Sequence, residues 1–207
     1  MGTSITKVKI CGITNLSDAL VACEVGADAL GFVFYKKSPR YIEPTKAKEI
    51  AQKLPPFVKK VGLFVNETPE FINETMKKSY MDLAQIHFEV SQKFLNKLEY
   101  SYVEVIRAKS KNDIANLPKD RYFLVDAFVT SYGGEGKRVE LSWFDEVDCS
   151  NIILAGGLNE KNIKEINRYD FYGVDVSSGV EKEKGIKDHN KIKNFINLAK
   201  KYDNKTK

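Results

Sequence analysis

The feature of this sequence that most constrains its fold is a repeated alternation of a short apolar run with a longer stretch of helical character. Each run is rich in the β-branched and aromatic residues that favour strands and is bounded by turn-forming residues. We expect a first strand in the stretch 7–14, where Gly12 ends it, and further strands at residues 29–34, 60–65, 82–87, 102–108, 121–127, 152–155 and 173–176.

The stretches between these runs carry the start and stop signals of helices. Asn15 or Ser17 can cap a first helix that stops near Gly26, and Pro44 suits the first turn of the second. Further helices are expected at residues 69–76, 91–99, 112–117, 142–147 and 159–167, and a last amphipathic one after Asp188 with an inner face of Ile192, Phe195, Ile196 and Ala199.

Eight strand-then-helix units predict an α/β protein, a single-domain (β/α)8 TIM barrel. The chain has 207 residues, which is short compared with the ~250 residues usual for that architecture. A doubly wound open sheet is the alternative, because it shows the same alternation. No linker or low-complexity segment divides the sequence, so we expect one domain over residues 1–207 with a polar tail from about residue 203.

The composition argues against several classes of function. The net charge is only +5, and the lysines are scattered rather than interleaved with aromatic residues, so we expect no nucleic-acid partner. No apolar run approaches the ~20 residues of a membrane span and no signal-peptide pattern opens the chain, so we expect no membrane partner. Three cysteines without ligand-like spacing indicate reduced thiols and a cytoplasmic location, and two histidines make a multi-histidine zinc site a poor fit.

Polar residues lie at the ends of several predicted strands, where a barrel carries its active site. Lys9 and Cys11 share one face of the first strand, and Gln85 and His87 share one face of the fourth, because residues two apart point the same way. Later strands contribute Arg107, Asp126, Asp175 and, just beyond the last strand, Ser177. Each has a structural explanation alone; Lys9 and Asp175, for example, could form a buried ion pair. Together they favour an active site, because every buried polar group needs a partner.

Two glycine-bearing turns suggest a phosphate site. Gly156 and Gly157 follow the seventh strand, and Ser177, Ser178 and Gly179 follow the eighth. Glycines let backbone N–H groups approach an anion, and loops seven and eight of such barrels commonly hold phosphate. The alternative is two ordinary turns. A third glycine-bearing loop, residues 133–137, lacks the Walker A pattern and is either a lid or merely a flexible loop.

Several motifs together resemble one enzyme family. They are residues 9–14 (KICGIT), 26–34 (GADALGFVF), 38–42 (SPRYI), 61–66 (VGLFVN), 85–87 (QIH), 154–159 (LAGGLN), 173–181 (GVDVSSGVE) and 185–189 (GIKDH). In this order, over nearly the whole chain, they resemble the phosphoribosylanthranilate isomerases of tryptophan biosynthesis.

The resemblance implies an aldose–ketose isomerase that acts on a small phosphoribosyl substrate. It would convert N-(5′-phosphoribosyl)anthranilate to 1-(2-carboxyphenylamino)-1-deoxyribulose 5-phosphate, an Amadori rearrangement without metal or organic cofactor, as a monomer or homodimer. By matching position, Cys11 would be the general base, Asp126 the general acid and Arg40 the group that holds the anthranilate carboxylate. Gln85, His87 and Asp175 would also bind substrate, and the two glycine-bearing turns would bind its phosphate.

These roles make demands on the two reacting groups. A carboxyl that donates a proton near neutral pH needs a pKa above its usual ~3.9, which burial can supply. A thiol that acts as a base needs cations nearby to stabilise its thiolate, and Lys9 and Arg107 are the candidates.

Two departures from the family pattern concern other parts of the chain. Phe88 stands where the family usually has glycine, and it could simply pack over the rim of the barrel. The segment between Lys137 and Trp143 is slightly longer than usual and lacks the usual Phe-Asp before the tryptophan.

Two other functions fit the pattern less well. The related isomerase of histidine biosynthesis uses a pair of aspartates, and Cys11 on the first strand argues against it. A phosphate-binding barrel without catalysis would keep the glycine-bearing turns but would need neither Cys11 nor Asp126.

Overall fold

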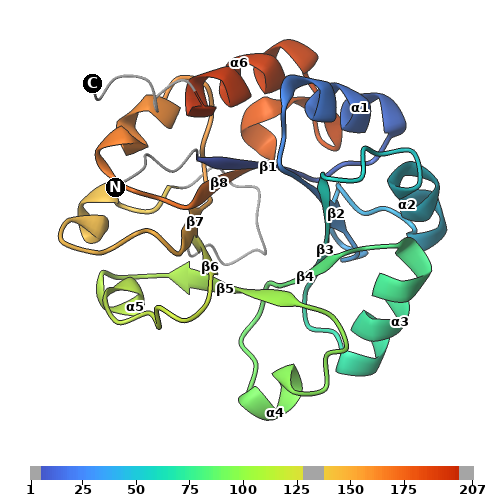
Figure 1. Ribbon diagram of the computed structural model, residues 1–207, viewed down its shortest axis with the longest axis horizontal. Coiled ribbons are helices and arrows are strands. Elements are labelled where there is room, and N and C mark those ends of the chain that lie inside the picture. Colours follow the sequence, from blue (N-terminus) through green and yellow to red (C-terminus); the bar gives the residue numbers. More distant parts are fainter. Residues whose placement is uncertain (1–5, 128–137, 201–207) are drawn as a thin grey trace.

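Hydrogen bonds between successive strands close the eight apolar runs into a ring. The computed structural model describes residues 6–127 and 138–200, and in it the strands run parallel in the order β1 to β8 (Figure 1). They are β1 (Lys7–Cys11), β2 (Ala29–Val33), β3 (Lys59–Phe64), β4 (Leu83–Ile86), β5 (Tyr102–Ala108), β6 (Phe123–Ala127), β7 (Ile152–Leu154) and β8 (Gly173–Val176). The open-sheet alternative is wrong, because β1 pairs with both β2 and β8. The chain is therefore a single-domain (β/α)8 barrel, as expected.

Four α-helices of eight residues or more cover one side of the ring: α1 (Leu16–Val25), α2 (Pro44–Ala51), α3 (Pro69–Ser79) and α6 (His189–Lys200). The predicted start and stop of α1 are confirmed, since the Asn15 side chain accepts a hydrogen bond from the Asp18 N–H and Gly26 ends the helix at a φ of 102°. Ile192, Phe195, Ile196 and Ala199 are the buried face of α6, as predicted.

The connections after β4 to β7 are less helical than predicted. The expected helix at residues 91–99 is only α4 (Gln92–Leu95), and the one at 112–117 is α5 (Asn112–Ala115). Two others are 3₁₀ turns, η1 (Leu141–Phe144) and η2 (Ile163–Arg168). Before η2, the side chains of Asn159 and Asn162 bind the N–H groups of Lys161 and Asn159, and these local turns compete with an α-helical start.

Strand alternation divides the apolar residues between two layers. Val8 and Ile10 of β1 point outward into the main core beneath the helices and are fully buried. Inside the ring, Val103, Val105, Leu124 and Ala155 form a separate cluster. The centre of the barrel is thus filled by side chains and is not an open pore.

A short hairpin was not predicted. After β8 the chain passes through η3 (Ser178–Val180) into β9 (Glu181–Glu183) and β10 (Ile186–Lys187), which pair antiparallel outside the barrel. The expected polar tail from residue 203 and the loop at residues 133–137 lie outside the described residues. No helix in the described part of the chain is long and apolar enough to cross a membrane.

Candidate active site

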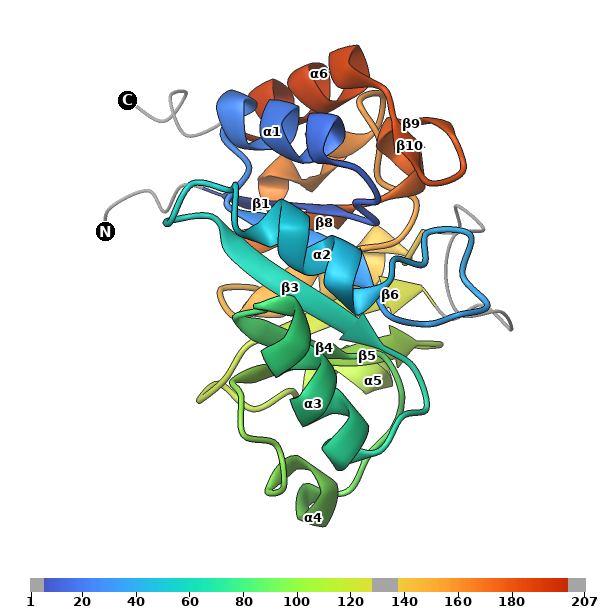
Figure 2. The ribbon, with the colours of Figure 1, turned by 90° about the vertical axis from the view of Figure 1, so that its right-hand side faces the viewer.

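The site residues predicted from sequence gather where the strands of the barrel end. In Figure 2 the arrowhead of β3 points to the right, towards the end of the barrel where the strands finish. The loop after β2 and the β9–β10 hairpin project on the same side. Cys11 is the last residue of β1, Asp126 is the last but one of β6, and Asp175 lies on β8. His87 follows β4 directly, and Arg40 comes from the loop after β2.

A buried ion pair stands beside Cys11. Lys9 Nζ lies 2.8 Å from Asp175 Oδ1, as the register of β1 against β8 requires. A β-carbon on Gly31 would lie 2.7 Å from Cys11 Sγ and 3.0 Å from Lys9 Nζ, so glycine makes room for both side chains. Burial raises the pKa of the Cys11 thiol above its ordinary value, although Lys9 and Lys187 oppose the rise.

Besides Lys9, a cation that was not predicted acts on Cys11. Arg107 contributes to the pKa values of His87 and Asp126. Lys187, which acts on Cys11, comes from the unpredicted hairpin. The thiol is thus held mainly in its neutral form before substrate binds.

Asp126 has the properties of a proton donor. Burial and, after it, the neighbouring Asp175 raise the pKa of Asp126 to about 6. The Ala127 N–H, which donates to Asp126 Oδ1 at 2.8 Å, acts in the opposite direction and lowers this pKa. His87 Nε2 lies 3.9 Å from Asp126 Oδ2. Burial, together with Arg107, lowers the pKa of His87 to about 4, so its ring is neutral at neutral pH and the contact is not an ion pair.

Gln85 lies deeper in the barrel than the other predicted substrate ligands. Its side chain is only 1% exposed, and its amide nitrogen lies 3.5 Å from His87 Nδ1. Its carbonyl oxygen has no hydrogen-bond partner among the described residues. The geometry therefore places Gln85 beneath His87.

Arg40 is held by a carboxylate that sequence reasoning did not single out. Its Nε and Nη2 atoms each donate to Glu181, both at 2.7 Å, and Glu181 also accepts from Lys187 Nζ at 3.0 Å. A β-carbon on Gly12 would lie 2.6 Å from Arg40 Cδ, so Arg40 crosses the end of β1 directly above this glycine. Glu181 and Lys187 are buried, and both fall within the sequence motifs quoted above.

The two glycine-bearing turns lie against each other. Gly156 and Gly157 have φ values of 84° and 62°, which favour glycine. A β-carbon on Gly179 would lie 1.9 Å from the carbonyl oxygen of Leu158. The turns after β7 and β8 therefore pack backbone to backbone, as a joint phosphate site would require.

Ser177 and Ser178 lie at the start of the second of these turns. Ser178 is the first residue of η3. The Ser177 carbonyl accepts from Lys187 Nζ at 3.2 Å, and a β-carbon on Gly12 would lie 3.0 Å from Ser177 Oγ. Ser177 thus stands between the end of β1 and the hairpin.

The departures from the family pattern have simple packing outcomes in the described residues. The Phe88 ring meets that of Phe94 edge-on, with centroids 5.6 Å apart, so it packs over the rim beside α4. Lys137 lies outside the described residues, whereas Arg138 pairs with Glu165 at 2.9 Å.

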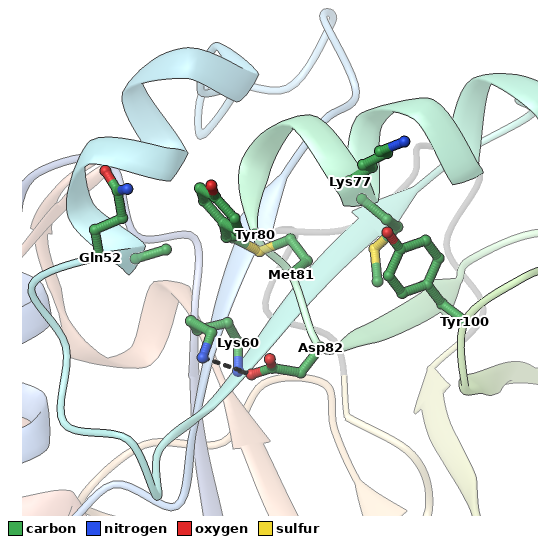
Figure 3. Close-up of a pocket in the computed structure, with 9 residues that line it drawn as sticks. Gln52, Lys60, Lys77, Tyr80, Met81, Asp82 and Tyr100 are labelled. Atoms are coloured by element: carbon green, nitrogen blue, oxygen red, sulfur yellow. Dashed lines mark hydrogen bonds and ion pairs between the residues drawn. The ribbon is translucent and has the colours of Figure 1, made fainter.

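A hollow of about 470 Å³ lies outside the barrel, between α2, α3 and the start of β4 (Figure 3). Two of its three charged residues, Lys60 and Asp82, are paired at 2.9 Å, and Lys77 is the third. Tyr80, Met81 and Tyr100 supply much of the rest of its wall. None of the predicted site residues lines it. In the residues that the structure describes, no group of three or more His, Cys, Asp or Glu side chains is placed to hold a metal ion.

The chain matches one family over almost its whole length. A family model described as N-(5′-phosphoribosyl)anthranilate (PRA) isomerase matches residues 8–198. An N-(5′-phosphoribosyl)anthranilate isomerase of Nitratiruptor sp. is 60% identical over 194 residues, which cover 94% of this chain and 98% of the relative.

Solved structures agree with this match. The crystal structure of phosphoribosyl anthranilate isomerase from Thermotoga maritima has a TM-score of 0.87 at 40% identity, over 95% of this chain and 100% of that chain. A structure of such an isomerase in complex with reduced 1-(o-carboxyphenylamino)-1-deoxyribulose 5-phosphate has a TM-score of 0.81 at 40% identity, with the same coverage. The alternative from histidine biosynthesis is not the family matched. The chain belongs to the N-(5′-phosphoribosyl)anthranilate isomerase family of tryptophan biosynthesis.

Proposed function

We propose that this protein converts N-(5′-phosphoribosyl)anthranilate to 1-(2-carboxyphenylamino)-1-deoxyribulose 5-phosphate, with Cys11 as general base and Asp126 as general acid. One observation carries the proposal: the buried Lys9–Asp175 pair acts on the pKa of both groups. Because β1 and β6 are three strands apart in a ring of eight, a substrate bound at the C-terminal end can lie between their last residues.

The first step is opening of the ribose ring. Asp126, with its pKa of about 6, gives a proton to the ring oxygen as the C1′–O bond breaks and the anilino nitrogen supplies the electron pair. The product of this step is a protonated Schiff base at C1′. His87 stays neutral beside Asp126 and does not compete as a cation.

The second step is removal of the C2′ proton. The Cys11 thiolate takes this proton, and the electrons of the C–H bond move towards the positive nitrogen to give an enolamine, which tautomerises to the ketone. Lys9 and Lys187 both favour the thiolate, although burial dominates the Cys11 pKa in the free enzyme. The sequence of steps needs neither a metal nor an organic cofactor.

Binding is divided between the two ends of the substrate. Arg40 holds the aromatic carboxylate. The turns after β7 and β8, with Gly156, Gly157, Ser177, Ser178 and Gly179, hold the phosphate. Asp175 and His87 line the space between, and Gln85 supports His87 from below. A solved relative carrying a phosphorylated product analogue supports this assignment of ligand class.

The test is an assay with freshly prepared N-(5′-phosphoribosyl)anthranilate, followed by anthranilate fluorescence. We expect turnover by the wild type and a fall in kcat of about 10²- to 10⁴-fold in Cys11→Ser, with little change in KM. Cys23→Ser, on the half-buried Cys23 of α1, is the matched control and keeps full activity. Near-normal turnover by Cys11→Ser would remove Cys11 from its role.

We further propose that the protein acts in the cytoplasm. Its three cysteines, Cys11, Cys23 and Cys149, are all unpaired, which suits a reducing compartment. Monomer and homodimer both stay predictions, which light scattering of the purified protein distinguishes.

A further inference from the structure

The β9–β10 hairpin buries two opposite charges, Glu181 and Lys187, and the mechanism above gives no role to Glu181. Lys182, Glu183 and Lys184 are exposed, whereas Glu181 is buried and the Lys187 side chain has no exposed surface. Burying charged groups is unfavourable unless they are paired and hydrogen-bonded, and an apolar pair would often serve stability as well. The hairpin therefore calls for an explanation beyond folding.

The Glu181 carboxylate is fully engaged by its surroundings. Oε1 accepts from Arg40 Nε, from Lys187 Nζ and, at 3.3 Å, from the Gly185 N–H, while Oε2 accepts from Arg40 Nη2. Two parallel bonds from one guanidinium fix its plane as well as its position. Burial alone would raise the pKa of Glu181, but Arg40 and Lys187 together hold it below its usual range, so the carboxylate is charged.

This arrangement leaves one edge of the guanidinium for a ligand. Glu181 occupies the edge formed by Nε and Nη2. On the other two-donor edge, Nη1 makes no hydrogen bond to any residue within 6–127 and 138–200, and Nη2 has a second N–H besides the one that it donates to Glu181. A guanidinium can bind one carboxylate on each of these edges.

The charge balance also favours a second carboxylate. Arg40 and Glu181 alone would be neutral, and protonated Lys187 gives the three groups a net charge of +1. Burial lowers the pKa of Lys187, and Glu181 opposes this by favouring the charged form. Lys187 is anchored independently, because its N–H donates to Asp18 at 2.8 Å and its Nζ donates to the Ser177 carbonyl. The hairpin thus holds a positive charge against the same carboxylate oxygen of Glu181 that Arg40 Nε binds.

We propose that Glu181 is a positioning residue that sets the enzyme's preference for a carboxylate on the aromatic ring of its substrate. It fixes the guanidinium plane so that the Nη1–Nη2 edge receives that carboxylate, and Lys187 keeps the group positive. The inference rests on the proposed function, in which Arg40 binds this end of the substrate, and it adds a residue that does not itself touch the ligand.

The experiment compares two stable ligands. One is reduced product, 1-(2-carboxyphenylamino)-1-deoxyribitol 5-phosphate, and the other is the same compound without the ring carboxylate. Their dissociation constants are measured by calorimetry for the wild type, Glu181→Gln and the control Glu183→Gln, which makes the same change on an exposed residue of the same hairpin.

We expect the wild type and Glu183→Gln to prefer the carboxylate-bearing ligand by about 10- to 100-fold, the range for charge-assisted hydrogen bonds. Glu181→Gln should lose most of this preference while binding the carboxylate-free ligand as the wild type does. If Glu181→Gln weakens both ligands equally, or changes neither, the inference is overturned, because a merely structural role would not discriminate between them.

Two further readouts complete the test. Arg40→Lys keeps the positive charge but lacks the two-donor edge, so it should lose the same preference; a full preference in this variant overturns the inference even where Glu181→Gln fails to fold. A wild type that binds both ligands equally would overturn the role of Arg40 and the inference with it. Absence of turnover in a wild type that still prefers the carboxylate would instead contradict the proposed function alone.

Discussion

The pKa of Asp126 makes a quantitative prediction about the pH dependence of catalysis. Burial and the nearby Asp175 raise this pKa to about 6. About half of the free enzyme then carries the proton at pH 6 and roughly a tenth at pH 7. The Cys11 pKa is raised above its ordinary value of 9.0. The reacting form, with Asp126 protonated and Cys11 ionised, is therefore the minor protonation state throughout.

The pKa of Asp126 and the raised pKa of Cys11 together determine how kcat/KM changes with pH. Below about pH 6 Asp126 is protonated, and kcat/KM rises tenfold per pH unit as more thiolate forms. Between about pH 6 and the Cys11 pKa, gain of thiolate and loss of the Asp126 proton cancel, so kcat/KM is flat. Above the Cys11 pKa it falls.

Asp126→Asn changes this profile in a specific way. Asparagine keeps the size and the acceptor for the Ala127 N–H but has no proton to give. We expect kcat to fall about 10²- to 10⁴-fold, equivalent to about 2.7–5.4 kcal/mol of transition-state stabilisation, with KM little changed. The break near pH 6 should disappear, because activity then tracks the thiolate alone and keeps rising through neutral pH.

The assay is kcat/KM by anthranilate fluorescence from pH 5.5 to 9. Asp120→Asn is the control, because Asp120 is exposed and precedes β6 at the opposite end of the same strand. A break near pH 6 that persists in Asp126→Asn would assign it to another group, and wild-type kcat in this variant would refute the reasoning.

Three further predictions concern the support of the site. In Gly179→Ala the new β-carbon would lie 1.9 Å from the Leu158 carbonyl oxygen. We expect this clash to raise the dissociation constant of the reduced product and to lower the free energy of unfolding by about 1–3 kcal/mol. An unchanged affinity and an unchanged urea midpoint would contradict the joint packing of the two turns. Lys9→Met should lower the free energy of unfolding by about 3–5 kcal/mol, because it leaves Asp175 buried without its partner, and a loss under about 1 kcal/mol in urea titration would argue against a tight pair. Phe195→Ala should also lower it by about 3–5 kcal/mol, because this side chain of α6 is fully buried, and the activity per folded molecule should be retained.

Sequence periodicity predicted the ring better than its outer layer. The strands β5 and β8 begin and end where expected, because each is an apolar run bounded by turn residues. The helices after β4 to β7 are short, and there side-chain turns such as those of Asn159 and Asn162 outweigh helical spacing. Whether a side-chain turn or a helix forms in such a segment depends on tertiary contacts, which the sequence pattern alone does not give.

Only part of the site was predicted from the sequence, because strand alternation is visible in a sequence whereas burial depends on the fold. Alternation along β1 placed Lys9 and Cys11 on one face, and the ion pair of Lys9 with Asp175 was foreseen as a structural possibility. Lys187 was missed, because a lysine in a charged hairpin is ordinarily exposed and only the fold shows it to be buried. The direction of the Cys11 pKa depends on burial, which no spacing rule reports.

The position of β1 in the ring has a consequence for how the protein matures. β1 is the first strand of the barrel in chain order, yet one of its two neighbours, β8, is the last strand of the barrel, and Lys9 meets Asp175 across 166 residues of chain. A nascent or truncated polypeptide that lacks β8 therefore has a thiol without its electrostatic surroundings and a barrel with an open seam. Contacts between such distant segments form slowly. Catalytic competence should consequently emerge only when the final strand docks, which makes enzyme activity a direct measure of barrel closure.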